Sequence, residues 1–194
     1  NWIGNIRVNN EAMGELVCGQ LLEHKKNKQP ASEPNNLLVI AGYKDDLEVK
    51  SRLIGIKNCI SKQKYDIKMD VIYADWDATK AKNLYLDYIN TQPDINTIIS
   101  MNAEMTSLII KELDLSDTKN ISVASMNWDS ETSSLIENNL LYGGVVGVEF
   151  LGASSIILLY DYLNGFDVKS QGFEYYTPFI FISSENFKHY EKFL

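Results

Sequence analysis

Residues 121–129 read Ile-Ser-Val-Ala-Ser-Met-Asn-Trp-Asp, an apolar strand that ends abruptly in polar and aromatic side chains. The next residues, Ser130-Glu131-Thr132, have the composition of a helix start. In an open parallel sheet, residues just past the carboxyl end of a strand face the crevice where ligands bind. Asn127, followed by Trp128 and Asp129, is therefore the first candidate for a binding site.

The same strand-then-helix pattern repeats along the chain. After a helix expected from Asn9-Asn10 to about Lys26, segments of strand length occur at 37–42, 67–74, 97–101 and 121–126, and apolar residues at helical spacing follow each of them. The continuous apolar run 37–42 is typical of a parallel strand that is covered on both faces. The regular alternation predicts an α/β fold with a doubly wound parallel sheet.

The ends of the chain depart from this pattern. We expect a short strand at 2–4, a last strand at 175–182 and a closing helix at 185–193. Three glycines within 142–147 weaken an ordinary central strand and suggest close backbone approach or a flexible crossing. The segment 150–163 is apolar on most of its helical circumference, so it is expected to be buried on all sides, against a missing partner lobe or a second copy of the chain.

Composition limits the function classes. The 194 residues are 45% hydrophobic and 23% charged, as in an ordinary soluble globular protein. The net charge is −8 and no basic cluster is longer than residues 24–28, which argues against nucleic-acid binding. No apolar run reaches the roughly 18 residues of a membrane helix, and residues 1–20 contain no signal-peptide pattern. Because the chain starts at Asn1, we expect a processed or excised fragment.

Cysteine and histidine usage predicts neither a metal site nor a cofactor. Cys18 and Cys59 lie in apolar helical patterns, which favours two buried free thiols over a disulfide. His24 and His189 stand alone and are expected at the surface, too few for a metal site. Phosphate-binding loops, nucleophile elbows and dinucleotide fingerprints are absent from the sequence, so catalysis has no candidate residues.

Four polar or aromatic residues near strand ends are the binding candidates: Arg52, Trp76, Asn102 and Asn127. Each has a structural alternative, because an arginine on a helix can form a surface salt bridge, a tryptophan can cover a helix, and an asparagine after a strand is usually a helix cap. Together they offer amides and a guanidinium around an aromatic face. That set suits a polyhydroxylated ligand, which needs polar contacts at its edges and apolar contact on its ring faces.

Several short motifs resemble the C-terminal part of type 1 periplasmic binding proteins, the ribose- and galactose-binding class. The resemblance runs the whole length, and it rests on Asn9-Asn10 with Gly14, Arg52-Leu53-Ile54-Gly55-Ile56, Ala74-Asp75-Trp76-Asp77, Pro93-Asp94-Ile95 with Ser100-Met101-Asn102-Ala103-Glu104-Met105, and Ser184-Glu185-Asn186. The family's Arg-x-x-Gly-Phe arginine binds sugar, so the resemblance implies that role for Arg52.

The chain departs from the family at three places. Ala103 replaces the usual aspartate, and Asn127 stands where sugar binders commonly have the aspartate of Gly-Phe-Asp. The Asn-Trp-Asp sequence is similar to that of a subgroup of solute-binding and sensor-type proteins. The hinge position that often carries glutamine falls within 147–149, which adds Glu149 to the ligand-binding candidates. Loss of an acidic hydroxyl acceptor argues against a plain hexose or pentose.

The resemblance also implies a two-lobed organisation. Residues 1–147 would form the C-terminal lobe, which is Rossmann-like. Residues 148–176 would belong to an N-terminal lobe whose remainder is absent, and residues 177–194 would supply a return strand and the closing helix. The helix at 150–163 would then have lost its sheet.

The expected function is that of an extracytoplasmic solute-binding protein without enzymatic activity or cofactors, periplasmic or extracellular, or attached to the membrane as a lipoprotein. It would bind a small sugar or sugar-like molecule between two lobes and serve the permease of an ABC importer or a membrane sensor kinase. Two alternatives stay open: the effector-binding domain of a LacI-type transcriptional regulator, and an enzyme on a similar fold. The acidic charge and the closing Ser-Glu-Asn element argue against the regulator.

Overall fold

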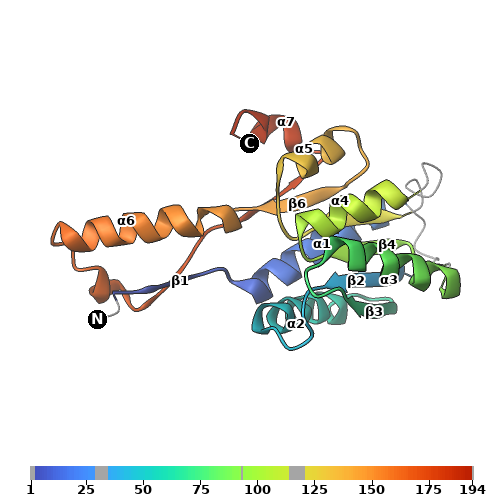
Figure 1. Cartoon of the computed structure of the whole chain (residues 1–194), viewed down its shortest axis with the longest axis horizontal. Coiled ribbons are helices and arrows are strands. Elements are labelled where there is room, and N and C mark those ends of the chain that lie inside the picture. Colours follow the sequence, from blue (N-terminus) through green and yellow to red (C-terminus); the bar gives the residue numbers. More distant parts are fainter. Residues whose placement is uncertain (1–2, 29–34, 93, 114–120, 194) are drawn as a thin grey trace. The chain divides into compact units, whose positions relative to one another are not determined.

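The computed structural model describes residues 3–28, 35–92, 94–113 and 121–193 (Figure 1). The chain forms two compact units, which we call unit 1 and unit 2. Unit 1 combines Asn1–Asn9 with Val146–Ile180, and unit 2 combines Asn10–Val145 with Phe181–Leu194. The segment between the helix expected to about Lys26 and the strand expected at 37–42 falls largely on residues 29–34, outside the described residues.

Unit 2 is built on a six-stranded sheet in the order β3-β2-β4-β5-β6-β8. The pairs β2–β3, β2–β4, β4–β5 and β5–β6 are parallel, which confirms the predicted doubly wound α/β fold. The strands are β2 (Asn35–Ala41), β3 (Ile67–Tyr73), β4 (Thr97–Ser100), β5 (Ser122–Ser125), β6 (Gly143–Val146) and β8 (Ile180–Ser183).

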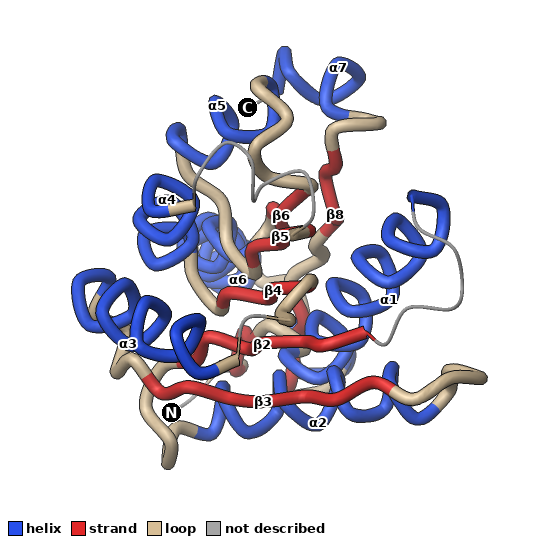
Figure 2. Tube along the Cα trace, turned by 90° about the vertical axis from the view of Figure 1, so that its right-hand side faces the viewer, coloured by secondary structure: helices blue, strands red, loops and turns tan. Residues whose placement is uncertain are grey.

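Helices cover both faces of this sheet (Figure 2). On one face lie α1 (Asn10–Lys28) and α2 (Leu47–Ser61), which pack against each other. On the other lie α3 (Ala78–Thr91), α4 (Ala103–Glu112) and α5 (Ser130–Glu137). Because both faces are covered, consecutive residues of β2 are buried: Leu38, Val39 and Ile40 have no exposed surface.

Each of the four helices α2 to α5 begins directly after the turn that leaves a strand. The capping side chains are Asp46, Asp77, Asn102 and Asp129, and each accepts a hydrogen bond from a backbone N–H of the first helical turn. Asp129 forms a capping box with Thr132. Short polar residues therefore end the strands and start the helices at the same edge of the sheet.

The strand order places a switch point between β2 and β4. From β2 the chain continues to β3 on one side and later to β4 on the other, so the two connections diverge at the carboxyl ends of these neighbouring strands. In doubly wound sheets, ligands bind in the crevice that opens at this point. The residues that follow β2, β3, β4 and β5 thus define the edge where a site is expected.

Unit 1 is small and contains a two-stranded parallel sheet. Its strands are β1 (Asn5–Arg7) and β7 (Glu174–Tyr176), and its main helix is α6 (Leu151–Leu163), flanked by the 3₁₀ turns η2 (Val148–Phe150) and η3 (Val168–Gln171). Strand β1 lies at 5–7, whereas residues 3–4 of the predicted strand 2–4 are not in a strand and residue 2 is outside the described residues. No residue of α6 is buried, contrary to the burial expected for 150–163, because a sheet of two strands covers only one side of a helix.

The C-terminal elements also differ from the prediction. The expected strand 175–182 is two strands in separate sheets, β7 and β8, because Pro178 lies between them and has no backbone N–H to donate to a sheet. The expected closing helix is the short α7 (Phe187–Tyr190) followed by the 3₁₀ turn η4 (Glu191–Phe193).

The glycine-rich segment forms an inner strand, β6, between β5 and β8. The prediction that these glycines disfavour a central strand is therefore wrong, and the predicted close approach of the backbone is confirmed. A Cβ atom at Gly143 would lie 2.5 Å from the carbonyl oxygen of Ile182 and 2.6 Å from the Phe181 ring. Only glycine allows β6 and β8 to approach so closely.

Candidate functional site

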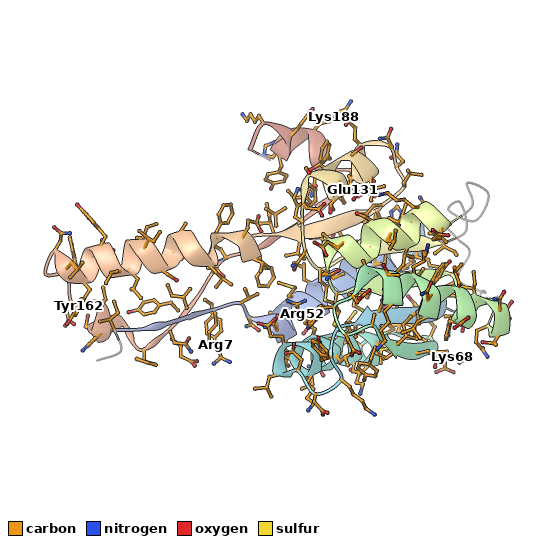
Figure 3. The ribbon with its side chains drawn as sticks, viewed as in Figure 1. Arg7, Arg52, Lys68, Glu131, Tyr162 and Lys188 are labelled. Carbon is orange, nitrogen blue, oxygen red and sulfur yellow. The ribbon has the colours of Figure 1, made fainter. Side chains whose placement is uncertain are left out.

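Arg52 lies inside unit 2 and is 4% exposed, although the Glu48 carboxylate with which it pairs is exposed. Its Nε donates to Oδ1 of Asn10, the first residue of α1, over 2.9 Å, and its Nη1 donates to the carbonyl oxygen of Met101 over 2.8 Å. Arg52 is labelled in Figure 3. Its Nη2 is 3.7 Å from the Glu48 carboxylate. Burial lowers the pKa of this guanidinium, while Glu48 and Asp46 oppose the change.

The hydrogen bond to Met101 holds Arg52 at the switch point. Met101 follows β4 directly, and its own N–H donates to the carbonyl oxygen of Ile40 in β2. The guanidinium has five N–H groups, and the two hydrogen bonds to Asn10 and Met101 use two of them. Arg52 is therefore a rigidly held donor group at the carboxyl ends of β2 and β4.

Trp76 lies in the tight turn after β3. Asp75 and Trp76 both have positive φ angles, 54° and 63°, which non-glycine residues rarely adopt. The indole lies against the backbone of Gly42, where a Cβ atom would be only 2.0 Å from the ring, and its Nε1 donates to the Asp46 carboxylate over 3.2 Å. These contacts turn the ring toward Arg52, whose Cζ is 5.7 Å from the ring centre.

Asn102 is the N-cap of α4. Its Oδ1 accepts from the N–H of Met105 over 2.8 Å, so the structural interpretation of this residue is correct. The side-chain NH₂ group is not part of that cap. Asn102 therefore has a fixed orientation at the end of β4.

Asn127 is not a helix cap, because Asp129 caps α5. Its side-chain oxygen is buried and has no hydrogen-bond partner among the described residues, a property it shares there with Ser107 Oγ. Its backbone is held by Ser125, whose Oγ donates to the Asn127 carbonyl oxygen over 2.8 Å. A buried acceptor without a partner is costly in a folded protein, which makes this atom a candidate for a ligand contact.

A polar network joins the two asparagines. Thr106 Oγ1 donates to the Asn102 carbonyl oxygen over 2.6 Å and lies 3.2 Å from Ser125 Oγ, which in turn holds the Asn127 carbonyl. The strands that precede the two asparagines pair in register, Ser100 opposite Ser125. The structure thus places Arg52, Trp76, Asn102 and Asn127 along the same edge of unit 2.

Glu149 belongs to unit 1 and not to unit 2. It is exposed in the turn η2, and its Oε2 accepts from the N–H of Gly147 over 3.0 Å. Gly147 has a φ of 130°, and a Cβ atom there would lie 2.4 Å from the carbonyl oxygen of Pro178. Glu149 therefore stabilises a tight crossing of the chain.

Several residues of this edge were not identified as site residues from the sequence. Asn10 bonds Arg52 and Asp46 bonds Trp76, yet neither residue was among the binding candidates taken from the sequence. A further correction concerns His24, which is 8% exposed and stacks on Tyr142 with ring centres 3.7 Å apart, whereas a surface position was expected. His189 is exposed as expected, and Cys18 and Cys59 are free and buried as expected.

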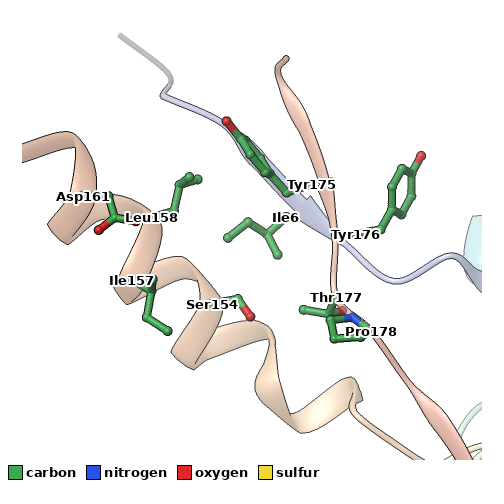
Figure 4. Close-up of a pocket in the computed structure, with 9 residues that line it drawn as sticks. All are labelled: Ile6, Ser154, Ile157, Leu158, Asp161, Tyr175, Tyr176, Thr177 and Pro178. Carbon is green, nitrogen blue, oxygen red and sulfur yellow. The ribbon is translucent and has the colours of Figure 1, made fainter. Parts of the chain in front are cut away.

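Two cavities lie away from the four strand-end residues. One of about 270 Å³ lies in unit 1 between α6 and the strands β1 and β7, with Ile157, Leu158 and Tyr175 in its wall (Figure 4). One of about 40 Å³ in unit 2 is lined by His24, Tyr142 and their neighbours. Neither of these two cavities includes the four strand-end residues.

The described residues contain no cluster of three or more histidine, cysteine or acidic side chains that could hold a metal ion. Among the helices of the described segments, none is both long enough and apolar enough to cross a membrane.

Comparisons with known proteins agree with this architecture. A sequence profile of the family described as periplasmic binding protein domain matches residues 3–166. A search of curated proteins finds no significant match.

Solved structures share the fold at low sequence identity. A glucose-galactose binding protein from Geobacillus stearothermophilus is 16% identical with a TM-score of 0.81, and the match covers 95% of this chain and 63% of that one. A periplasmic solute-binding protein of an ABC transporter from Actinobacillus succinogenes 130z, with bound D-allose, is 17% identical with a TM-score of 0.83 and coverages of 96% and 63%. A periplasmic sugar-binding protein from Pseudomonas fluorescens is 19% identical with a TM-score of 0.84 and coverages of 97% and 59%.

The chain thus spans about 60% of the length of these solved structures. The family profile, the parallel sheet and the motifs at the strand ends all agree. The chain belongs to the periplasmic binding protein domain family and has its type 1 fold.

Proposed function

We propose that the chain is part of an extracytoplasmic protein that binds a small polyhydroxylated molecule, a sugar or sugar-like compound, without changing it chemically. The observation that carries this proposal is the buried guanidinium of Arg52, fixed at the switch point within 5.7 Å of the Trp76 ring centre. A guanidinium held by Asn10 and Met101 is already oriented, so little conformational entropy is lost when a ligand binds.

Each strand-end residue has a separate role in this proposal. The remaining N–H groups of Arg52 would donate to ligand hydroxyls, and the Trp76 ring would cover an apolar face of the ligand. The buried Oδ1 of Asn127 would accept a hydrogen bond from a hydroxyl, which supplies the partner this atom lacks. The side-chain NH₂ of Asn102 would donate, because its Oδ1 is engaged in the helix cap.

The ligand class has support from the solved structures. The Actinobacillus succinogenes protein holds D-allose, and a carbohydrate transporter solute-binding protein from Agrobacterium radiobacter is in complex with D-arabinose. The asparagine at position 127 is neutral. It therefore accepts a hydrogen bond from a hydroxyl less strongly than a carboxylate would, and we propose a ligand other than a plain hexose or pentose.

In the complete protein the ligand would bind between two lobes. Residues 10–145 and 181–194, which form unit 2, would supply the C-terminal lobe. Residues 1–9 and 146–180, which form unit 1, would belong to the N-terminal lobe, with Glu149 at the hinge. Large apolar side chains on α6 are exposed, which supports a further part of the N-terminal lobe, or a second copy of the chain, covering this helix: Ile156, Ile157, Leu159, Tyr160 and Leu163. Closure of the lobes would signal to an ABC permease or a sensor kinase.

Calorimetric titration of the full-length protein against sugars, polyols and small signal molecules tests the proposal. Arg52→Ala and Asn127→Ala are expected to weaken binding of the ligand found by at least about tenfold, since each removes a buried hydrogen-bonding group. Lys50→Ala on the exposed side of α2 and Asn138→Ala at the end of α5 are the matched controls and should bind as the unchanged protein does. Unchanged affinity in both site variants would disprove the site.

A further inference from the structure

The two helices α1 and α2 approach each other to backbone contact. A Cβ atom at Gly14 would lie 2.2 Å from the carbonyl oxygen of Arg52, and one at Gly55 would lie 2.0 Å from the carbonyl oxygen of Glu11. Helices in ordinary contact have axes about 8–10 Å apart, set by the side chains between them. Because both helices present a glycine at this contact, α1 and α2 lie closer than helices that pack through larger side chains.

Polar pairs along this contact define the register of the two helices. Asn58 Nδ2 donates to the Glu11 carboxylate over 2.9 Å, and one turn further along both helices Lys62 pairs with Glu15. The helices therefore run parallel, and a step of four residues in α1 matches a step of four in α2. The contacts of Gly14 with Arg52 and of Gly55 with Glu11 centre the crossing on the two glycines. Four residues after Gly14 and Gly55 stand Cys18 and Cys59, one turn further along each helix.

Both cysteines are buried, with exposures of 0% and 3%, and both are free thiols. Interaction with the Cys59 sulfur, and burial, raise the pKa of the Cys18 thiol, while interaction with Cys18 lowers the pKa of Cys59. The half-buried Tyr65 lies close enough that both sulfurs act on its hydroxyl. The two thiols therefore influence each other at a place where the backbones of α1 and α2 are held close.

We propose that Cys18 and Cys59 form an intramolecular disulfide that links α1 to α2. A disulfide needs Cα atoms about 4.4–6.8 Å apart, a spacing that side-by-side helices reach only when small residues allow close approach. Gly14 and Gly55 supply that approach one turn before the cysteines. The oxidant in an extracytoplasmic compartment would be a thiol oxidase or a low-molecular-weight disulfide.

The reaction proceeds by thiol–disulfide exchange. The Cys59 thiolate attacks the disulfide of the oxidant and releases one of its thiolates. Cys18 then loses its proton and attacks Cys59, and the second half of the oxidant leaves as a thiolate. The two cysteines lose two protons and two electrons, and the oxidant is reduced to two thiols. Because both sulfurs are buried in the fold, the bond forms while the chain folds.

The test begins with the full-length protein refolded in a buffer of reduced and oxidised glutathione. Free thiols are then alkylated in denaturant, and peptide mass mapping locates every cross-link. We expect a monomer without alkylated cysteines in which the Cys18 and Cys59 peptides are joined. Its melting temperature should exceed that of the dithiothreitol-treated protein by about 5–10 °C.

Cys18→Ala and Cys59→Ala are the matched variants, and each should lose the difference in melting temperature between oxidised and reduced samples. Two free thiols after refolding, or only mixed or intermolecular disulfides, would overturn the proposal. The disulfide proposal depends on the proposed function in one respect: the extracytoplasmic location supplies the oxidant. Thiol counting requires no ligand, so its failure is distinguishable from failure of the proposed binding function.

Discussion

The guanidinium carbon of Arg52 lies 5.7 Å from the centre of the Trp76 ring, although one residue belongs to a helix and the other to the turn after a strand. Asp46 connects the two elements, because it caps α2 and accepts the indole N–H. The cation and the ring are thus positioned before any ligand binds. Such preorganisation raises affinity by lowering the entropy lost on binding.

Replacement of Arg52 by lysine should lower the free energy of unfolding by about 1–3 kcal/mol. A lysine cannot bond both Asn10 and Met101, so a buried acceptor is left without a partner. Urea unfolding followed by circular dichroism measures the change. The control is Lys50→Ala on the exposed side of the same helix, expected to alter stability by less than about 0.5 kcal/mol. Equal stability of Arg52→Lys and the unchanged protein would contradict the structural role of Arg52.

Two glycines of α1 should respond to alanine in opposite directions. Gly14→Ala places a methyl group 2.2 Å from the Arg52 carbonyl oxygen, so the helices must separate, at a cost of about 1–3 kcal/mol. Gly19 has no neighbouring atom within 4 Å of the added Cβ, so Gly19→Ala should stabilise the helix by about 0.5–1 kcal/mol. Chemical unfolding of both variants checks the signs, and a Gly14→Ala variant as stable as Gly19→Ala would rule out the backbone contact.

Alanine variants of two glycines in unit 1 distinguish the effect of backbone conformation from that of steric contact. Gly147 and Gly165 have φ angles of 130° and 85°, which disfavour alanine. Only Gly147 has close neighbours, with the Pro178 carbonyl oxygen 2.4 Å from an added Cβ. Gly165→Ala should cost about 1–2 kcal/mol, and Gly147→Ala clearly more. Hydrogen exchange of the amides in 146–180 reports the loss, and equal protection in the two variants would argue against a tight crossing at Gly147.

Stability should fall as the pH drops below about 6.5, in part because of His24. Burial, together with Lys28, lowers the pKa of this histidine in the folded state, while Glu185 opposes the change. The unfolded chain therefore binds the proton at a higher pH than the folded chain, and stability present at neutral pH is lost toward pH 5. Thermal melts between pH 5 and 7.5 measure the slope.

His24→Phe keeps a ring against Tyr142 and removes the titrating group, so its slope should be shallower. The exposed His189→Phe is the control and should leave the slope as it is in the unchanged protein. If the His24→Phe slope matched that of the unchanged protein, another group would be responsible.

Asn127→Asp should shift ligand preference toward plain hexoses or pentoses. The change introduces the carboxylate that sugar binders of this family commonly have at this position. A charged acceptor strengthens a hydrogen bond by about 1 kcal/mol, or roughly fivefold in affinity. Titration of the full-length variant with a panel of sugars measures the shift. The same panel with Asn138→Asp is the control, and an unchanged order of affinities would exclude position 127 from selectivity.

Much of unit 2 could be predicted because its signals are local. The apolar strand 37–42, the helix start predicted at Ser130-Glu131-Thr132 and the apolar spacing of the helices depend on neighbours in sequence. Unit 1 was predicted less well. Its strand β1 pairs with β7, more than 160 residues away, and a three-residue strand has no periodicity strong enough to identify it.

The candidate site shows the same division. The sequence by itself determined that four residues follow or flank parallel strands: Arg52, Trp76, Asn102 and Asn127. The reason is that the alternation of apolar strands with polar strand ends is a local property of the sequence. Only the tertiary structure decided that Arg52 is buried, that Asn102 is occupied as a cap and that the Asn127 oxygen lacks a partner. Burial and hydrogen bonding depend on which segments distant in sequence pack together. Asn10 in α1 bonds Arg52 in α2, for example, and no local sequence pattern predicts that contact.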